Sequence, residues 1–305
     1  MWGIVVLVVV AAASAVADES LSFPEDARER SSQRIVSGWP AEPGQIPFQL
    51  SLRMVNAGGQ VSSCGGSLIH HEWGLTAAHC TGQRVSLVIR AGTVNLTRPG
   101  IIFETMQYYN HPNYNEAIVS IVQPNDIGLI KFNKFVEYNS IIQPIRIQRS
   151  ADRDFNYDQI RLTASGWGRT WTGGASPEVL NWVYLNGVSN AFCRLAFGLS
   201  PIIQPTTICA SGYNDTTQST CQGDSGGPLT TVEQDGKLSI VGVTSFVSGQ
   251  GCHADMPAGF VRPGYYHDWF TEVSGINFDW DWEKEPDSSE EAAEESHEAV
   301  KVVQI

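Results

Sequence analysis

A serine surrounded by glycines is the feature of this sequence with the clearest chemistry. Residues 223–228 read Gly-Asp-Ser-Gly-Gly-Pro, with Ser225 in the middle. Glycines on both sides let the backbone come close to another molecule and turn its N–H groups toward one point. The oxyanion that develops during acyl transfer needs such a group of donors. Six specific residues in order favour a nucleophilic serine over a plain glycine turn.

Two further residues could activate this serine. His79 lies in Thr-Ala-Ala-His-Cys, among small residues, and Asp126 comes directly before an apolar run that begins at Ile127. Each alone has an ordinary explanation, as a packed histidine or as a solvated acid at the start of a strand. A serine hydroxyl, however, needs a base with a pKa near the working pH, and a buried carboxylate fixes the tautomer of that base. Together they predict a triad of His79, Asp126 and Ser225.

A second type of hydrolase shares part of this pattern. Gly223, Ser225 and Gly227 match the G-x-S-x-G turn of α/β-hydrolases. That class has the chain order serine, acid, histidine, whereas this sequence has histidine, acid, serine. The sequence also shows no alternation of strands and helices, so we set this reading aside.

The elements that must position these residues are predicted to be strands. From Ile35 onward, short apolar or β-branched runs are separated by Gly, Pro and Asn, which is typical of an all-β sandwich or barrel. One closing helix is expected over residues 265–273, where apolar residues recur at three- and four-residue steps and Gly275 ends the pattern. The runs expected to be strands are 48–52, 67–69, 86–89, 127–132, 160–164, 179–185 and 238–244.

Over about residues 35–274 the chain resembles the chymotrypsin family of serine proteases. The segments that carry the resemblance, besides the three above, are Ile35-Val36-Ser37-Gly38, Cys64-Gly65-Gly66-Ser67-Leu68, Gly166-Trp167-Gly168 and Ser245-Phe246. The resemblance implies two six-stranded antiparallel β-barrels with a C-terminal helix. It also implies a secreted endopeptidase that forms an acyl-enzyme and needs no cofactor or metal. The N–H groups of Gly223 and Ser225 would hold the oxyanion.

A catalytically inactive homologue that acts as a binding module is the alternative from another class. Such proteins generally lack one member of the triad, whereas all three matching positions here hold the expected residue. We therefore expect an enzyme.

Six cysteines indicate three disulfides in an oxidising compartment. Zinc binding is disfavoured because no pair has the C-x-x-C spacing. The sequence alone leaves the connectivity open. The resemblance implies the pairs Cys64–Cys80, Cys193–Cys209 and Cys221–Cys252.

The N-terminal residues predict secretion followed by activation. Residues 1–17 contain an apolar run and end in Ala-Val-Ala, as in a cleaved signal peptide. Residues 18–34 are polar, contain no cysteine and are expected to be a solvated activation peptide. By the resemblance, a trypsin-like protease would cut after Arg34, and the new amine of Ile35 would pair with Asp224.

Three residues are expected to shape the primary specificity pocket. Ser219 stands six residues before Ser225, at the position that forms the pocket floor in the family, and it offers no charge for Arg or Lys. Val247 and Ala258 correspond to the walls and would narrow the pocket. These residues predict an elastase-like preference for small or medium apolar side chains, with a chymotrypsin-like preference for Phe or Leu as the alternative.

The net charge of −13 is concentrated at the ends of the chain. Residues 276–305 hold ten acidic residues and two lysines, and we expect this tail to be disordered beyond a peptidase domain of residues 35–275. No basic patch suggests nucleic acid, and no later apolar stretch suggests a membrane span. We expect a monomer that meets protein or peptide substrates, an activating protease and protein inhibitors. Asn95 and Asn214 begin glycosylation sequons.

Overall fold

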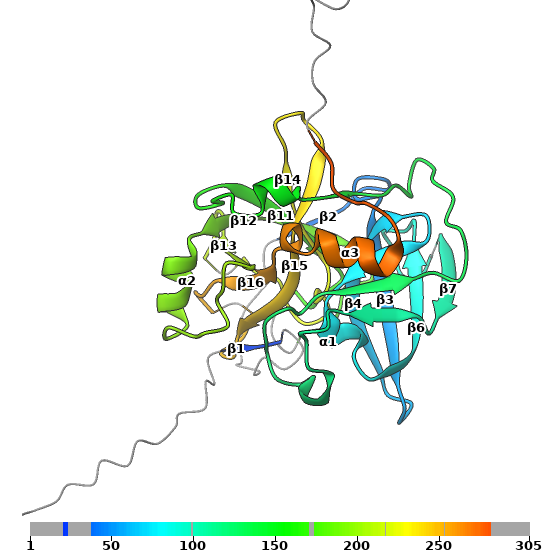
Figure 1. Cartoon of the computed structure of the whole chain (residues 1–305), viewed down its shortest axis with the longest axis horizontal. Coiled ribbons are helices and arrows are strands. Elements are labelled where there is room, and N and C mark those ends of the chain that lie inside the picture. The colour runs from blue at the N-terminus through cyan, green and yellow to red at the C-terminus, as the bar shows by residue number, and fades with distance from the viewer. Residues whose placement is uncertain are drawn as a thin grey trace, which may run out of the picture.

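The chain folds into two β units that lie side by side. The computed structural model describes residues 21–23, 38–98, 100–170, 174–216, 218–252 and 254–281. Figure 1 shows the N-terminal unit in blue to blue-green on one side of the molecule and the barrel strands of the C-terminal unit in green to gold on the other. The predicted signal peptide lies outside the described residues.

The N-terminal unit is a seven-stranded antiparallel sheet. Its strand order is β7-β6-β3-β4-β5-β9-β8. Within the described residues the end strands β7 and β8 do not pair with each other. The strands are β3 (Gln49–Asn56), β4 (Val61–His70), β5 (Trp73–Thr76), β6 (Arg84–Ala91), β7 (Ile101–Thr105), β8 (Tyr108–Asn110) and β9 (Gly128–Lys131).

The C-terminal unit is a closed barrel of six strands. The order is β15-β14-β11-β12-β13-β16, and the pairing of β15 with β16 closes the ring. Three short strands pair with strands of the barrel: β1 (Leu21–Ser22) and β10 (Arg146–Ile147) pair with β15, and β2 (Trp39–Pro40) pairs with β12. The barrel strands are β11 (Arg161–Gly166), β12 (Asn181–Val188), β13 (Thr207–Gly212), β14 (Pro228–Val232), β15 (Leu238–Ser248) and β16 (Ala258–Val261).

Helical segments join and cover the strands. In the described part of the chain three are α-helices, α1 (Ala78–Thr81), α2 (Asn190–Ala196) and α3 (His267–Ser274), and three are single 3₁₀ turns, at Glu116–Ile118, Ser150–Asp152 and Pro263–Tyr265. Helix α3 ends at Gly275, which adopts φ +74° and closes the last turn. None of the helices in the described part of the chain is both long enough and apolar enough to span a membrane.

One apolar cluster joins the two units. It contains side chains from the N-terminal sheet such as Leu50 and Leu75, together with Ile240 and Val243 of β15 and Phe270 of α3. Burial of this shared apolar surface stabilises the contact between the units. Because the cluster crosses from one unit to the other, the loops at their boundary have a fixed relative position.

The all-β prediction with a C-terminal helix is confirmed. Each predicted run overlaps a strand of the structure, and the predicted helix overlaps α3 with Gly275 as its end. One detail differs, because the N-terminal unit is a seven-stranded sheet whose end strands are not paired with each other in the described residues.

Two expectations about the chain ends need correction. The leader was expected to be solvated, but Leu21–Ser22 pairs with β15 and Phe23 is buried. The tail was expected to be disordered from residue 276, but residues 276–281 pack on the body. The Phe278 ring lies edge-on to Phe270, and the Trp280 indole N–H donates to the Ile147 carbonyl at 2.7 Å. Aromatic side chains make these contacts, although the acidic composition of the segment favours solvation. Residues 282–305 lie outside the described part.

Candidate active site

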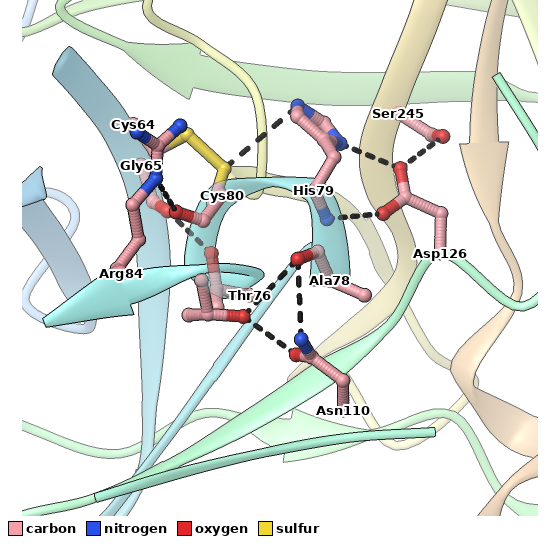
Figure 2. The surroundings of a disulfide bond; sticks show 11 residues. Cys64, Gly65, Thr76, Ala78, His79, Cys80, Arg84, Asn110, Asp126 and Ser245 are labelled. Atoms are coloured by element: carbon pink, nitrogen blue, oxygen red, sulfur yellow. Dashed lines mark hydrogen bonds and ion pairs between the residues drawn. A yellow bond between two sulfur atoms is a disulfide. The ribbon is translucent and has the colours of Figure 1, made fainter. Parts of the chain in front are cut away.

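His79 is held at the end of the N-terminal sheet. It lies in the short helix α1, which begins directly after β5 and Ala77. The next residue, Cys80, is bonded to Cys64 of β4, and the Thr76 hydroxyl donates to the Gly65 carbonyl at 2.9 Å. Figure 2 shows these anchors around the histidine. A disulfide and a hydrogen bond thus fix the backbone that carries the imidazole of His79.

Asp126 binds the histidine at two points. Its carboxylate accepts the backbone N–H of His79 at 2.8 Å and the ring Nδ1 at 2.7 Å. The carboxylate is fully buried. Because Nδ1 donates to a carboxylate, the neutral ring carries its proton on Nδ1 and leaves Nε2 as an acceptor. This is the tautomer that a general base requires.

A third group on this carboxylate comes from the other β unit. The Ser245 hydroxyl of β15 donates to Asp126 Oδ2 at 2.6 Å, as Figure 2 shows. Ser245 was noted in the sequence only as part of a family segment, and its role was missed. A buried serine inside the apolar run of β15 is a signal that could have found it, because a buried hydroxyl requires a partner.

Two buried tyrosines lie near the charge of Asp126. Burial raises the pKa of both Tyr114 and Tyr266, and the negative charge of Asp126 raises it further. Both phenols therefore stay neutral over the physiological range of pH. Neither phenol therefore places a second negative charge beside the His79–Asp126 pair.

The loop that carries Ser225 packs against the same end of the N-terminal sheet. Gly65 N–H donates to the Ser225 carbonyl at 2.7 Å, and Gly226 N–H donates to the Thr244 carbonyl at 2.8 Å. Gly226 adopts φ +75°, and a Cβ there would overlap the Thr76 hydroxyl. Only glycine fits so close a contact. The loop is therefore seated against Thr76, three residues before His79.

Asp224 has a tightly enclosed carboxylate. Oδ1 accepts the Gly168 N–H at 2.7 Å, and Oδ2 accepts the Cys221 N–H at 2.9 Å. A Cβ on Gly166 or Gly168 would overlap this carboxylate. The glycines of the Gly-Trp-Gly segment thus make room for the acid beside Ser225. Gly223, just before it, adopts φ +100°, where glycine is favoured.

A cavity lies beside Asp224. Its volume is about 280 Å³, and it is lined by Gly38, Gly166, Gly168, Ser219, Thr220 and Asp224 among others. Gly38 follows three residues after Ile35, whose own position lies outside the described residues, as does that of Arg34. The cavity is therefore lined by the first described residue that follows Ile35 in the sequence.

All three predicted pocket residues are buried in the C-terminal half of the chain. Val247 and Ala258 are both buried and belong to one apolar cluster, next to the paired residues Phe246 and Gly259. Ser219 lines the cavity beside Asp224. The structure thus brings the two wall residues into one cluster and places the floor residue in a cavity that Asp224 also lines.

The cysteines form three disulfides, Cys64–Cys80, Cys193–Cys209 and Cys221–Cys252. These are the pairs that the resemblance implies. The sulfurs of Cys64 and Cys80 lie within 4.8 Å of a ring nitrogen of His79. Both are in a disulfide, so this group offers no thiolate to a metal ion.

The two sequons differ in accessibility. Asn95 is half-buried, and its side-chain oxygen accepts both the backbone N–H and the hydroxyl of Thr97. Asn214 is exposed in the turn after β13. Asn214 is thus the more open of the two candidates.

A two-unit β fold with a buried His–Asp pair beside a glycine-flanked serine is that of a serine protease. Comparison with known proteins gives the family. The family model Trypsin matches residues 35–270. The chain therefore belongs to the trypsin family.

Several relatives match most of the chain. Collagenase from Hypoderma lineatum is 33% identical, over 85% of this chain and 94% of the relative. Chymotrypsin-like elastase family member 1 from Rattus norvegicus is 33% identical, over 82% and 91%. Serine protease 1 from Drosophila melanogaster is 35% identical, over 80% and 87%. A solved structure of HL collagenase is similar with a TM-score of 0.70 and 34% identity, covering 79% of this chain and 99% of that one.

Proposed function

We propose that this trypsin-family protease is a secreted endopeptidase in which His79, Asp126 and Ser225 form the catalytic triad. The observation that carries the proposal is the buried contact of Asp126 with His79, at 2.8 Å to the backbone N–H and 2.7 Å to Nδ1. This contact leaves Nε2 as the proton acceptor. The loop of Ser225 packs against the residues just before His79, which supports a working pair of serine and histidine.

The proposed reaction has two halves. His79 Nε2 takes the proton of the Ser225 hydroxyl as its oxygen attacks a peptide carbonyl, and the N–H groups of Gly223 and Ser225 bind the resulting oxyanion. His79 then gives its proton to the leaving amine, and an acyl-enzyme remains. In the second half His79 activates a water molecule, which releases the acid product. Asp126 stabilises the imidazolium in both halves and stays ionised.

The triad is tested with single and double variants of the activated enzyme. Ser225→Ala is expected to abolish turnover of a peptide substrate and to leave the melting temperature close to that of the parent. Adding His79→Ala should cost little more, because the members of a triad act as a unit. Ser63→Ala, at an exposed serine of β4, is the matched control and should keep full activity. Losses in the double variant that equal the sum of the single losses would contradict the assignment.

We also propose that the chain is a zymogen that is cut after Arg34. Two observations support this: the cavity beside Asp224 is also lined by Gly38, three residues after Ile35, and the Asp224 carboxylate is enclosed by the backbone N–H groups of Gly168 and Cys221. An amine from Ile35 would be a suitable partner there. Loss of one partner from a buried charge pair costs about 3–5 kcal/mol, which is enough to distort the neighbouring oxyanion site.

Trypsin treatment tests this step. The parent precursor should gain activity when trypsin cuts after Arg34, and an Arg34→Ala precursor should not. Arg28→Ala and Arg30→Ala, at the other two leader arginines, are the matched controls and should activate normally. Full activity of uncut precursor would refute the mechanism.

The substrate preference is proposed to be elastase-like. Val247 and Ala258 lie in one buried cluster, which supports a narrowed apolar pocket, and relatives named as elastases share about a third of their residues with this chain. Ser219 supplies no negative charge for Arg or Lys. A chymotrypsin-like preference for Phe or Leu is the alternative. Peptides that differ only in Ala, Val, Leu, Phe or Arg before the scissile bond distinguish the two.

Secretion, partners and modification complete the proposal. The N-terminal sequence and the disulfides support an extracellular protein. We propose that it is a monomer that meets peptide or protein substrates, a trypsin-like activator and protein inhibitors. Exposure of Asn214 supports a glycan at that sequon. A mass decrease after enzymatic removal of N-glycans, lost in Asn214→Gln, would test it.

A further inference from the structure

A leader segment forms an extra strand on the barrel. Strand β1 pairs antiparallel with the end of β15, with Leu21 opposite Ser248 and Ser22 opposite Val247. Figure 1 shows β1 lying beside β15 at the end of the barrel. This stretch of β15 begins two residues after Ser245, whose hydroxyl binds Asp126. The leader is thus attached next to the proposed triad.

The residue that follows this strand covers the catalytic histidine. The Phe23 ring stacks on the His79 imidazole with 3.8 Å between ring centroids and 23° between the planes. Phe23 is only 3% exposed. Leu21, two residues earlier, packs against the apolar cluster that contains Phe197 and Phe246. Both side chains therefore anchor the segment on the body.

Such an arrangement is strand addition, in which backbone hydrogen bonds give affinity and alternate side chains give specificity. The leader runs from Ser248 toward Ser245 and then over His79, so it occupies the space that an extended peptide needs to reach the base. The next residue in the sequence, Pro24, has no backbone N–H.

We propose that the segment Leu21–Phe23 makes the leader an intramolecular competitive inhibitor, which fills the substrate strand on β15 and covers His79. The inference rests on the proposed peptidase function of the same site. It adds a second step to activation. Because residues 18–34 contain no cysteine, a cut after Arg34 leaves the leader held only by these noncovalent contacts. Full activity then requires the leader to dissociate as well.

A synthetic peptide of residues 18–34 tests this on the trypsin-activated protein after the leader is removed by gel filtration. The peptide should inhibit cleavage of a small peptide substrate competitively and should be recovered intact. Phe23→Ala in the peptide should raise its inhibition constant at least about tenfold, as expected for a buried aromatic anchor. Glu29→Ala, a substitution beyond the paired segment, is the matched control and should leave the constant unchanged.

Direct binding separates this inference from the proposed function. A fluorescent leader peptide should bind the activated Ser225→Ala protein, with the same weakening by Phe23→Ala. If the parent enzyme is active but the peptide neither binds nor inhibits up to about millimolar concentration, the inference is wrong. Cleavage of the peptide within residues 21–25, or equal inhibition by the Phe23→Ala peptide, would also overturn it. If the peptide binds but the activated parent hydrolyses nothing, the proposed function fails instead.

Discussion

Replacement of Trp280 by alanine should destabilise the protein measurably, although this residue lies in an acidic tail. The Trp280 indole N–H donates to the Ile147 carbonyl at 2.7 Å, and the Arg146 guanidinium lies 3.9 Å from the ring centroid. Asp279, just before it, accepts hydrogen bonds from the backbone N–H and the hydroxyl of Ser150. The tail thus docks on β10 and on the turn that follows it.

The size of the effect follows from these contacts. A hydrogen bond contributes about 1 kcal/mol, and a partly exposed cation–π contact contributes about 0.5–1 kcal/mol. Partial burial of the indole adds about 1 kcal/mol. The free energy of unfolding should fall by about 2–3 kcal/mol in Trp280→Ala. At about 2–4 °C per kcal/mol for a protein of this size, the melting temperature should fall by about 4–12 °C.

Thermal unfolding is best measured in a Ser225→Ala background, where self-cleavage cannot occur. Trp280→Phe keeps an aromatic ring and loses the N–H donor, so it should show about a third to a half of the effect. Asp281→Asn is the matched control, because the Asp281 side chain is 97% exposed and its pair with Arg149 is long, at 3.8 Å. A shift below about 1 °C in Trp280→Ala would refute the view that the tail docks.

Three further results are expected. Asp126→Asn should keep the fold and lower kcat by about 10⁴, because an amide no longer selects the Nδ1–H tautomer of His79; a loss below about tenfold would contradict the triad. Burial acts to raise the pKa of Asp279, but the hydrogen bonds from Ser150 outweigh it and the pKa is lowered. The ionised carboxylate therefore stabilises the folded protein above the ordinary carboxyl pKa of about 4, and this stabilisation is lost as the pH falls through and below that value. The difference in melting temperature between the parent and Asp279→Asn should therefore be constant from pH 7 to about pH 5 and shrink as the pH falls below about 4, and a difference that grows on acidification would reverse the sign of the argument. Val247→Gly should move the preferred residue before the scissile bond toward Phe by at least about tenfold in kcat/KM, and no change in a peptide series would show that Val247 does not line the pocket.

The chemistry of this protein could be predicted because it depends on residue types at particular positions. His79, Asp126 and the glycine-rich segment around Ser225 each had an ordinary alternative, and only their joint occurrence favoured a triad. The structure then places Asp126 on His79 at hydrogen-bond distance. The bond from Ser245 was not predicted, because Ser245 and Asp126 are far apart in the sequence. A serine inside an apolar run indicates that its hydroxyl needs a partner, but it does not indicate which residue that partner is.

The two chain ends were harder to predict for a common physical reason. Composition averaged over a segment favours solvation when charges dominate, yet docking can depend on one or two side chains. In the leader these are Leu21 and Phe23, and in the tail they are Phe278 and Trp280. A two-residue strand such as β1 also has no periodic pattern to detect. The binding surface that receives each segment exists only after the body has folded.

The Asp126 carboxylate is bound by side chains from both halves of the molecule. Asp126 and His79 belong to the N-terminal sheet, whereas Ser245 and the loop of Ser225 belong to the C-terminal barrel. In the proposed triad, neither half alone contains the nucleophile together with its base. A small separation of the two halves would therefore abolish turnover while every strand stayed intact. On heating, turnover should then be lost at a lower temperature than β-structure. Fragments released by cleavage between the halves would be inert as soon as they separated.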